Sequence, residues 1–211
     1  MLPTVDQLLS RINTAALYPP FLAKLRTLLE NCLAQGAVYY VTCGERRWEE
    51  LGKLYAIGRT TGTPGHFVTK ALPGQSFHNY GLSTDACRDL DLNRTGLQPD
   101  YRDQANIILA QEATKIGLES GYYWTFKDSP HVQLKIKQVG LSVKDLQNWY
   151  KAGGKAEVWK QLDRHYAPQK QVVAVVEPVK EPKEPEIVDL GKQCIEPVPT
   201  VKAEVALEAA P

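Results

Sequence analysis

The proline-rich segment at the end of the chain limits the part of the sequence that can fold into a packed domain. Residues 168–211 contain seven of the 14 prolines, with eight acidic residues against five lysines, in phrases such as EPVKEPKEPE. A segment of this composition buries too little apolar surface to offset its ordering entropy. We therefore expect one domain over residues 1–167 and an extended tail or linker over residues 168–211.

Charge and cysteine content exclude several functional classes. The net charge is +1 at pH 7. The chain therefore lacks the large positive charge that would indicate binding to nucleic acid or anionic lipid. The four cysteines lie far apart without a C-x-x-C pair, unlike a disulfide scaffold or a cysteine zinc site. The first 20 residues lack a charged segment followed by an apolar run, and no stretch reaches the roughly 20 apolar residues of a membrane span. We expect a soluble protein, made in the cytoplasm without a signal peptide.

Hydrophobic periodicity predicts both helices and strands before the tail. Helical spacing covers residues 21–35, 45–58, 102–117, 142–150 and 155–166. Strand composition covers residues 37–43, 83–92 and 131–139, the last with period-two alternation. The helices do not alternate regularly with strands, as a doubly wound parallel sheet would require. The sequence therefore favours an α+β fold with a small, mostly antiparallel sheet and flanking helices.

Two segments offer metal ligands in a chain that has four histidines. His78 and Asp85 flank a glycine in PGQSFHNYGLSTDACRDL, and His131 follows in DSPHVQL. Imidazole nitrogens and carboxylate oxygens are ordinary zinc ligands, and a catalytic zinc site uses three protein ligands and keeps one position open. Asp128 lies three residues before His131 with Pro130 between them, so a turn feeding a strand would hold this carboxylate beside the metal as a base. The pair of His78 and Asp85 alone is a weak signal, because such spacing is usually coincidence.

The residues around this pair resemble the signature of the LAS-type zinc peptidases. They spell S-x-H-x-x-G-x-x-x-D, from Ser76 to Asp85. The longer stretch LYAIGRTTGTPGHFVTKALPGQSFHNYGLSTD is similar to the endopeptidase branch found in phage endolysins and bacterial cell-wall hydrolases. FKDSPHVQL resembles the second motif of that branch, F-x-D-x-P-H-x-Q. The resemblance implies a LAS- or hedgehog-like peptidase domain.

The resemblance also implies roles for individual residues. The implied zinc ligands are His78, Asp85 and His131, and the implied general base is Asp128. Arg46 matches a family arginine that would bind a substrate carboxylate or stabilise the oxyanion, although Arg47 beside it is an alternative. Ser76 would either contact substrate or accept a local backbone hydrogen bond.

Other residues near these motifs have competing interpretations. Tyr122, Tyr123 and Trp124 are either a wall for a glycopeptide or part of the core. Cys87 would share the strand face of Asp85, but a thiolate would fill the open position of the zinc site, so we assign it to packing. His66 is more typical of an exposed loop than of an active site.

The implied function is zinc-dependent hydrolysis of peptidoglycan stem peptides. Aspartate at position 128, where carboxypeptidase relatives commonly have glutamate, favours an L-alanyl-D-glutamate endopeptidase. Because the sequence predicts no signal peptide, we expect a phage enzyme, either an endolysin or a virion-associated one. The alternatives are a D-Ala-D-Ala carboxypeptidase and a non-catalytic zinc module of the cell wall or a virion. The expected cofactor is Zn²⁺. The expected partners are peptidoglycan and, through the tail, virion proteins, with no nucleic acid and no membrane span.

Overall fold

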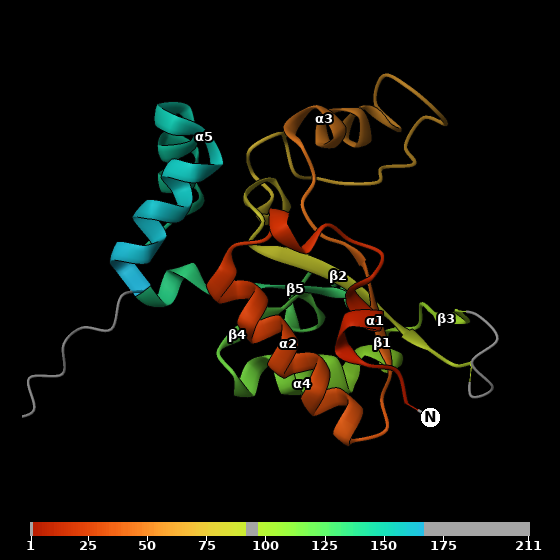
Figure 1. Cartoon of the computed structure of the whole chain (residues 1–211). Coiled ribbons are helices and arrows are strands. Elements are labelled where there is room, and N and C mark those ends of the chain that lie inside the picture. Colours follow the sequence, from red (N-terminus) through yellow and green to blue (C-terminus); the bar gives the residue numbers. More distant parts are fainter. Residues whose placement is uncertain (1, 92–96, 167–211) are drawn as a thin grey trace, which may run out of the picture. The chain divides into compact units, whose positions relative to one another are not determined.

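A five-stranded antiparallel sheet organises residues 2–91 and 97–166, the part of the chain that the computed structural model describes (Figure 1). The strands are β1 (Tyr39–Cys43), β2 (Ser83–Asp89), β3 (Pro99–Asp100), β4 (Leu118–Ser120) and β5 (His131–Leu134). Their order is β1-β2-β5-β4, with β3 paired to β2. The α+β architecture with an antiparallel sheet is thereby confirmed. The predicted tail, residues 168–211, lies outside the described residues.

Helices surround this sheet. They are α1 (Val5–Leu9), α2 (Pro19–Ala34), α3 (Trp48–Ala56), α4 (Ile107–Lys115) and α5 (Val143–Tyr166). Figure 1 shows α2 and α4 side by side against one face of the sheet, and the two helices are in direct contact. In the described residues, no helix combines the length and the apolarity needed to cross a bilayer.

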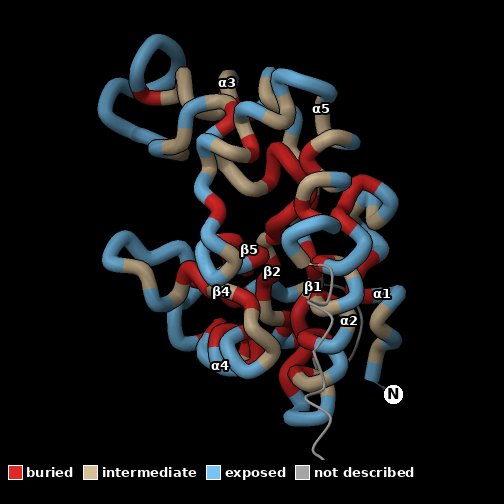
Figure 2. The backbone as a smooth tube through the Cα atoms, turned by 90° about the vertical axis from the view of Figure 1, so that its left-hand side faces the viewer, coloured by how far each residue is buried: buried red, intermediate tan, exposed pale blue. Residues whose placement is uncertain are grey.

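The hydrophobic core lies between the sheet and the apolar faces of α2 and α4. Strands β2 and β5 contribute Ala86, Val132 and Leu134 to this core, and α2 contributes residues such as Phe21 and Leu25. Because side chains alternate along a strand, the residues between them point to the opposite face. Figure 2 shows the buried backbone gathered around the strands, whereas the segment after α3 is exposed.

The last predicted strand is shorter than expected. Strand β5 ends at Leu134, and residues Ile136–Val139 form a 3-10 helix that ends at Gly140, which has a left-handed conformation with φ of 76°. The prediction of a strand over residues 131–139 was therefore wrong in its second half. Ile136 is buried, and the chain turns there to enter α5. An alternating sequence cannot distinguish this turn from continued strand.

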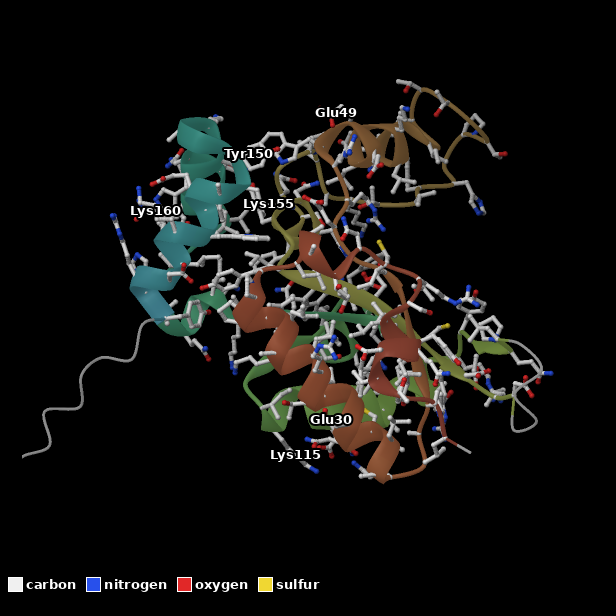
Figure 3. The ribbon with its side chains drawn as sticks, viewed as in Figure 1. Glu30, Glu49, Lys115, Tyr150, Lys155 and Lys160 are labelled. Atoms are coloured by element: carbon white, nitrogen blue, oxygen red, sulfur yellow. The ribbon has the colours of Figure 1, made fainter. Side chains whose placement is uncertain are left out.

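The last two predicted helices form one element with a break. Gly153 and Gly154 have non-helical backbone angles within α5. In Figure 3, Tyr150 and Lys155 on α5 lie on either side of this break. The Tyr150 ring stacks on Trp48 at the start of α3, with ring centroids 4.7 Å apart. The Nζ atom of Lys155 lies 2.5 Å from a carboxylate oxygen of Glu45, so the break allows both halves to hold the segment that leads into α3.

Candidate active site

The sheet register brings two of the predicted ligands together. Asp85 on β2 and His131 on β5 are direct cross-strand partners on the face opposite the core. Their side chains meet with Asp85 Oδ1 3.0 Å from His131 Nδ1. His78 reaches the same point from the 3-10 helix Phe77–Tyr80, with its Nε2 atom 3.2 Å from Asp85 Oδ1 and 3.3 Å from His131 Nδ1. The structure thus joins three side chains that are far apart in the sequence.

The H-N-Y-G segment holds His78 through its neighbours. Asn79 is buried and joins two loops, because its Oδ1 accepts from the Gly74 amide at 2.9 Å and its Nδ2 donates to the Arg46 carbonyl at 2.7 Å. Gly81 ends the 3-10 helix with φ of 69°, and a Cβ atom there would lie 2.3 Å from the Ala16 carbonyl oxygen. Glycine is therefore required at position 81 both for conformation and for space.

Hydrogen bonds on the far side of each imidazole fix which nitrogen carries the proton. His78 Nδ1 lies 2.6 Å from the Gly44 carbonyl oxygen, and His131 Nε2 lies 3.0 Å from the Gln133 Oε1 atom. Both partners are acceptors, so these nitrogens donate. The lone pairs of His78 Nε2 and His131 Nδ1 therefore face the Asp85 carboxylate in the neutral rings. Three acceptors that converge in this way need a cation between or beside them.

The spacing of these three atoms fits zinc. In a tetrahedral site with metal–ligand bonds of 2.0–2.1 Å, neighbouring ligand atoms are about 3.3 Å apart. The observed separations are 3.0, 3.2 and 3.3 Å. Carbonyl acceptors behind metal-binding imidazoles are also the usual outer contacts of such sites. The donor set and its spacing therefore suit a zinc ion held by three protein ligands.

The electrostatics of the cluster also demand positive charge. Burial lowers the pKa of His78, but the hydrogen bond to Asp85 and the nearby Cys43 outweigh it and raise that pKa to about 10. Burial raises the pKa of Asp85, yet the hydrogen bonds from His131 and His78 outweigh it and hold the pKa well below its usual range. The ionised carboxylate therefore recruits a proton onto the His78 imidazole unless a metal ion supplies the charge.

A tight turn presents Asp128 to this cluster. The His131 amide donates to the Asp128 carbonyl at 3.0 Å, as the proline-containing sequence predicts. Carboxylate and imidazole atoms of Asp128, Asp85 and His131 lie within 4.8 Å of one another. Gly121 packs against this turn so closely that a Cβ atom there would lie 2.4 Å from the Asp128 carbonyl oxygen. Asp128 is an exposed residue, but partial desolvation of its carboxylate beside the cluster, to which repulsion from Asp85 adds, raises its pKa.

The guanidinium at the site belongs to Arg46. Its Nη2 atom lies 3.7 Å from Asp85 Oδ2 and donates to the Cys43 sulfur at 3.0 Å. Arg47 is exposed and occupies the N-cap of α3, where its amide donates to Glu50 at 2.9 Å. Of the two arginines that the sequence left open, Arg46 is therefore the one that faces the metal cluster.

The sequence reasoning missed Cys43. Strand β1 has a bulge between Val41 and Cys43, and this bulge pairs Cys43 with Asp85 on the site face. The Cys43 sulfur lies 3.9 Å from His78 Nδ1, and Cys43, His78 and Asp85 offer ligand atoms that lie within 4.8 Å of one another, so Cys43 borders the cluster. Cys87, which the sequence placed beside Asp85, is buried, as expected for a packing residue. Alternation of side chains along a strand could not have predicted that Cys43, and not Cys87, borders the site, because the bulge shifts which residues of β1 face it.

The cluster lies in a cleft with a volume of about 690 Å³, which suits a small peptide. Arg46, Ser76 and Asp128 line it together with the metal cluster. Ser76 also caps the 3-10 helix, since its Oγ accepts from the His78 amide at 3.4 Å, so its local backbone role is present.

Two exposed loops form the walls of this cleft. Trp124 and Phe126 come from the segment before the catalytic turn, and Lys70 reaches across from the loop after α3 to lie 3.8 Å from the Phe126 ring centroid. The sequence left Tyr122, Tyr123 and Trp124 between a cleft wall and the core. Trp124 lines the cleft, whereas Tyr122 and Tyr123 do not, and Tyr123 is exposed. His66 is exposed in the loop after α3.

Comparison with curated proteins identifies a relative with the expected chemistry. The chain is 33% identical over 108 residues to the peptidoglycan L-alanyl-D-glutamate endopeptidase CwlK of Bacillus subtilis (strain 168). The predicted resemblance to the LAS-type peptidases is confirmed. The match covers 47% of this chain and 62% of CwlK. No family model matches the chain.

Comparison with solved structures gives two weaker similarities. One is the L-Ala D-Glu endopeptidase ChiX of Serratia marcescens, with a TM-score of 0.45, 20% identity, and coverage of 61% of this chain and 88% of ChiX. The other is the LD-carboxypeptidase LdcB, with a TM-score of 0.40, 23% identity, and coverage of 62% of this chain and 75% of LdcB.

Proposed function

We propose that this chain is a zinc-dependent peptidoglycan stem-peptide hydrolase, an endopeptidase that cleaves between L-alanine and D-glutamate. The observation that carries this proposal is the convergence of two imidazole nitrogens and one carboxylate in a cleft, with a further carboxylate within 4.8 Å. The similarity to CwlK, whose name gives this activity, supports the choice of bond.

Each residue has a chemical task in this proposal. His78, Asp85 and His131 hold the zinc ion, which supplies Lewis acidity towards the scissile carbonyl and acidifies water. Asp128 accepts the proton of the attacking water and delivers it to the leaving amine, a task that its raised pKa favours. Arg46 binds a carboxylate of the D-glutamyl residue or the developing oxyanion. Ser76 contacts the peptide beside the ligands.

The first test is digestion of purified sacculi with identification of the released muropeptides by mass spectrometry. Wild-type protein should release fragments with a new N-terminal D-glutamate, and a chelator should stop the reaction. Asp128→Asn should retain zinc and lose activity by about 10²–10⁴-fold, the usual contribution of a general base. Asp6→Asn, the same exchange at an exposed position on α1, should leave activity unchanged.

The products also decide between the alternatives. Release of free D-alanine would instead identify a D-Ala-D-Ala carboxypeptidase. Zinc binding without any product would identify a non-catalytic module of the cell wall or a virion. Full activity of Asp128→Asn would overturn the assignment of the base.

The proposal extends to a phage enzyme that is made in the host cytoplasm and acts on cell-wall peptidoglycan. The support is the resemblance of residues 54–85 to the endolysin branch of the family. Expression in bacteria should then cause lysis when a phage holin is produced in the same cells and not without it. The proposed attachment of the tail to virion proteins concerns residues outside the described part of the chain.

A further inference from the structure

A chain of hydrogen bonds runs from the cleft wall to one metal ligand. The Trp124 indole donates from Nε1 to Glu119 Oε1 at 2.8 Å. The Gln133 amide donates from Nε2 to Glu119 Oε2 at 3.3 Å. The His131 ring donates from Nε2 to Gln133 Oε1 at 3.0 Å. All four side chains therefore form one connected series that ends at the imidazole.

The sheet places these groups in contact. Glu119 on β4 and Gln133 on β5 are direct cross-strand partners, and Gln133 follows His131 by two residues. Residues two apart on a strand share a face, so all three side chains point towards the cleft. Glu119, Trp124 and Gln133 line the same cleft as the metal cluster. The arrangement is therefore built into the register of β4 and β5.

Glu119 determines which group donates and which accepts in each hydrogen bond of this series. An ionised carboxylate can only accept hydrogen bonds, so Gln133 must turn its NH₂ group towards Glu119 and its oxygen towards His131. The oxygen of Gln133 then requires a proton on His131 Nε2. In the neutral ring this leaves His131 Nδ1, which faces Asp85 and His78, with a free lone pair.

We infer that Glu119 is a positioning residue: its carboxylate fixes the amide of Gln133 and thereby keeps the metal-facing nitrogen of His131 unprotonated. This inference rests on the proposed zinc site and adds an outer residue to it. Outer contacts of this kind typically change metal affinity or activity by about 10–100-fold when they are removed.

The substitution Glu119→Gln tests the donor and acceptor roles in this series, because glutamine has nearly the same shape as glutamate but its amide nitrogen is a donor. The new amide must turn its oxygen to the Trp124 indole, so its NH₂ group faces the NH₂ group of Gln133. Gln133 then rotates and presents its NH₂ group to His131 Nε2, which must accept, and the proton moves to the metal-facing nitrogen. Zinc affinity, measured by competition with a chromophoric chelator, should fall by about 10–100-fold.

Either of two additional substitutions should restore the hydrogen bond that His131 Nε2 donates to residue 133. In Glu119→Gln/Gln133→Glu, the amide at 119 donates to the carboxylate at 133, which accepts from His131 Nε2 as the native amide does. In Glu119→Gln/Trp124→Phe, the indole donor is gone, so the amide at 119 can turn its oxygen to Gln133. Each double variant should bind zinc at least ~10-fold more tightly than Glu119→Gln alone.

Controls separate this inference from a general loss of stability. Glu49→Gln makes the same exchange at an exposed position on α3, which is labelled in Figure 3, and should leave zinc affinity unchanged. Thermal unfolding of the metal-free proteins should not differ between Glu119→Gln and its rescued forms. Wild-type affinity in Glu119→Gln, or no recovery in either double variant, would overturn the role of Glu119. If wild-type protein binds no zinc, the proposed function fails instead.

Discussion

The close packing of Gly121 against the turn that carries Asp128 gives a sharp test of how the proposed base is positioned. A Cβ atom at residue 121 would lie 2.4 Å from the Asp128 carbonyl oxygen and 3.1 Å from the Asp128 Cβ. Ordinary van der Waals contact begins at 3.4 Å. Residue 121 directly follows β4, which is paired with β5, so we expect Gly121→Ala to displace the Asp128 backbone by about 1 Å, the difference between 2.4 Å and 3.4 Å.

The size of the expected effect follows from this displacement. A misplacement of about 1 Å in a catalytic group lowers turnover by about 10²-fold, which corresponds to about 2.7 kcal/mol in activation free energy. The three metal ligands do not lie in the displaced part of the turn, although the His131 amide is bonded to the Asp128 carbonyl. We expect zinc affinity to change by less than about tenfold, which is a small effect beside the usual losses for altered ligands.

The assay is hydrolysis of a defined stem peptide followed by chromatography, with zinc affinity measured on the same preparations. Gly52→Ala is the matched control, because a Cβ atom at this position in α3 would lie 3.6 Å from the Pro73 side chain, which is an ordinary contact. The control should be as active as the wild type. Wild-type turnover in Gly121→Ala would refute the claim that this turn fixes the position of the Asp128 carboxylate.

Other predictions concern stability and the cleft loops. Gly81→Ala should lower the free energy of unfolding in urea by at least ~2 kcal/mol, because φ is positive there and Ala16 blocks the space; an unchanged midpoint would contradict this. Zinc at 100 times its Kd should add about 2.7 kcal/mol and raise the melting temperature by several degrees, and His131→Ala should lose this shift. Arg59 lies between two aromatic rings, 3.8 and 4.6 Å from their centroids, and donates to two backbone carbonyls, so Arg59→Ala should speed limited proteolysis within residues 59–69. Equal cleavage rates in the two proteins would show that the loop does not depend on this clamp.

Much of the fold could be predicted from local patterns. Strands β1 and β2 lie within the ranges expected from periodicity, and helix α2 begins at Pro19, two residues before its expected range. Gly153 and Gly154 divide the last helix between the two helical ranges predicted there. Strand β4 was not predicted, because three residues carry no periodic signal and its register depends on β5. The second half of the 131–139 segment has alternating polarity, yet it forms a turn whose apolar residue points into the core.

The convergence of His78, Asp85 and His131 was predictable from the sequence, whereas the surroundings of these residues were not. The histidines and the aspartate carry a recognisable spacing, and the structure brings them within 3.3 Å of one another. The contributions of Cys43 and Glu119 depend on a bulge and on cross-strand pairing, which are long-range properties of the sheet. The choice between Arg46 and Arg47 depended on which residue begins α3, a boundary that periodicity leaves uncertain by a few residues.

The two imidazoles lie far apart along the chain, so binding of the proposed ion would report whether β2 and β5 are paired. His78 and His131 are 53 residues apart, and closing a loop of that length in an unfolded chain carries an entropic penalty of about 3.5 kcal/mol plus a constant. Tight binding of the ion by both histidines therefore requires that β2 and β5 are already paired. During unfolding, the release of zinc to a fluorescent indicator should therefore report the separation of these strands in real time, without any label on the polypeptide.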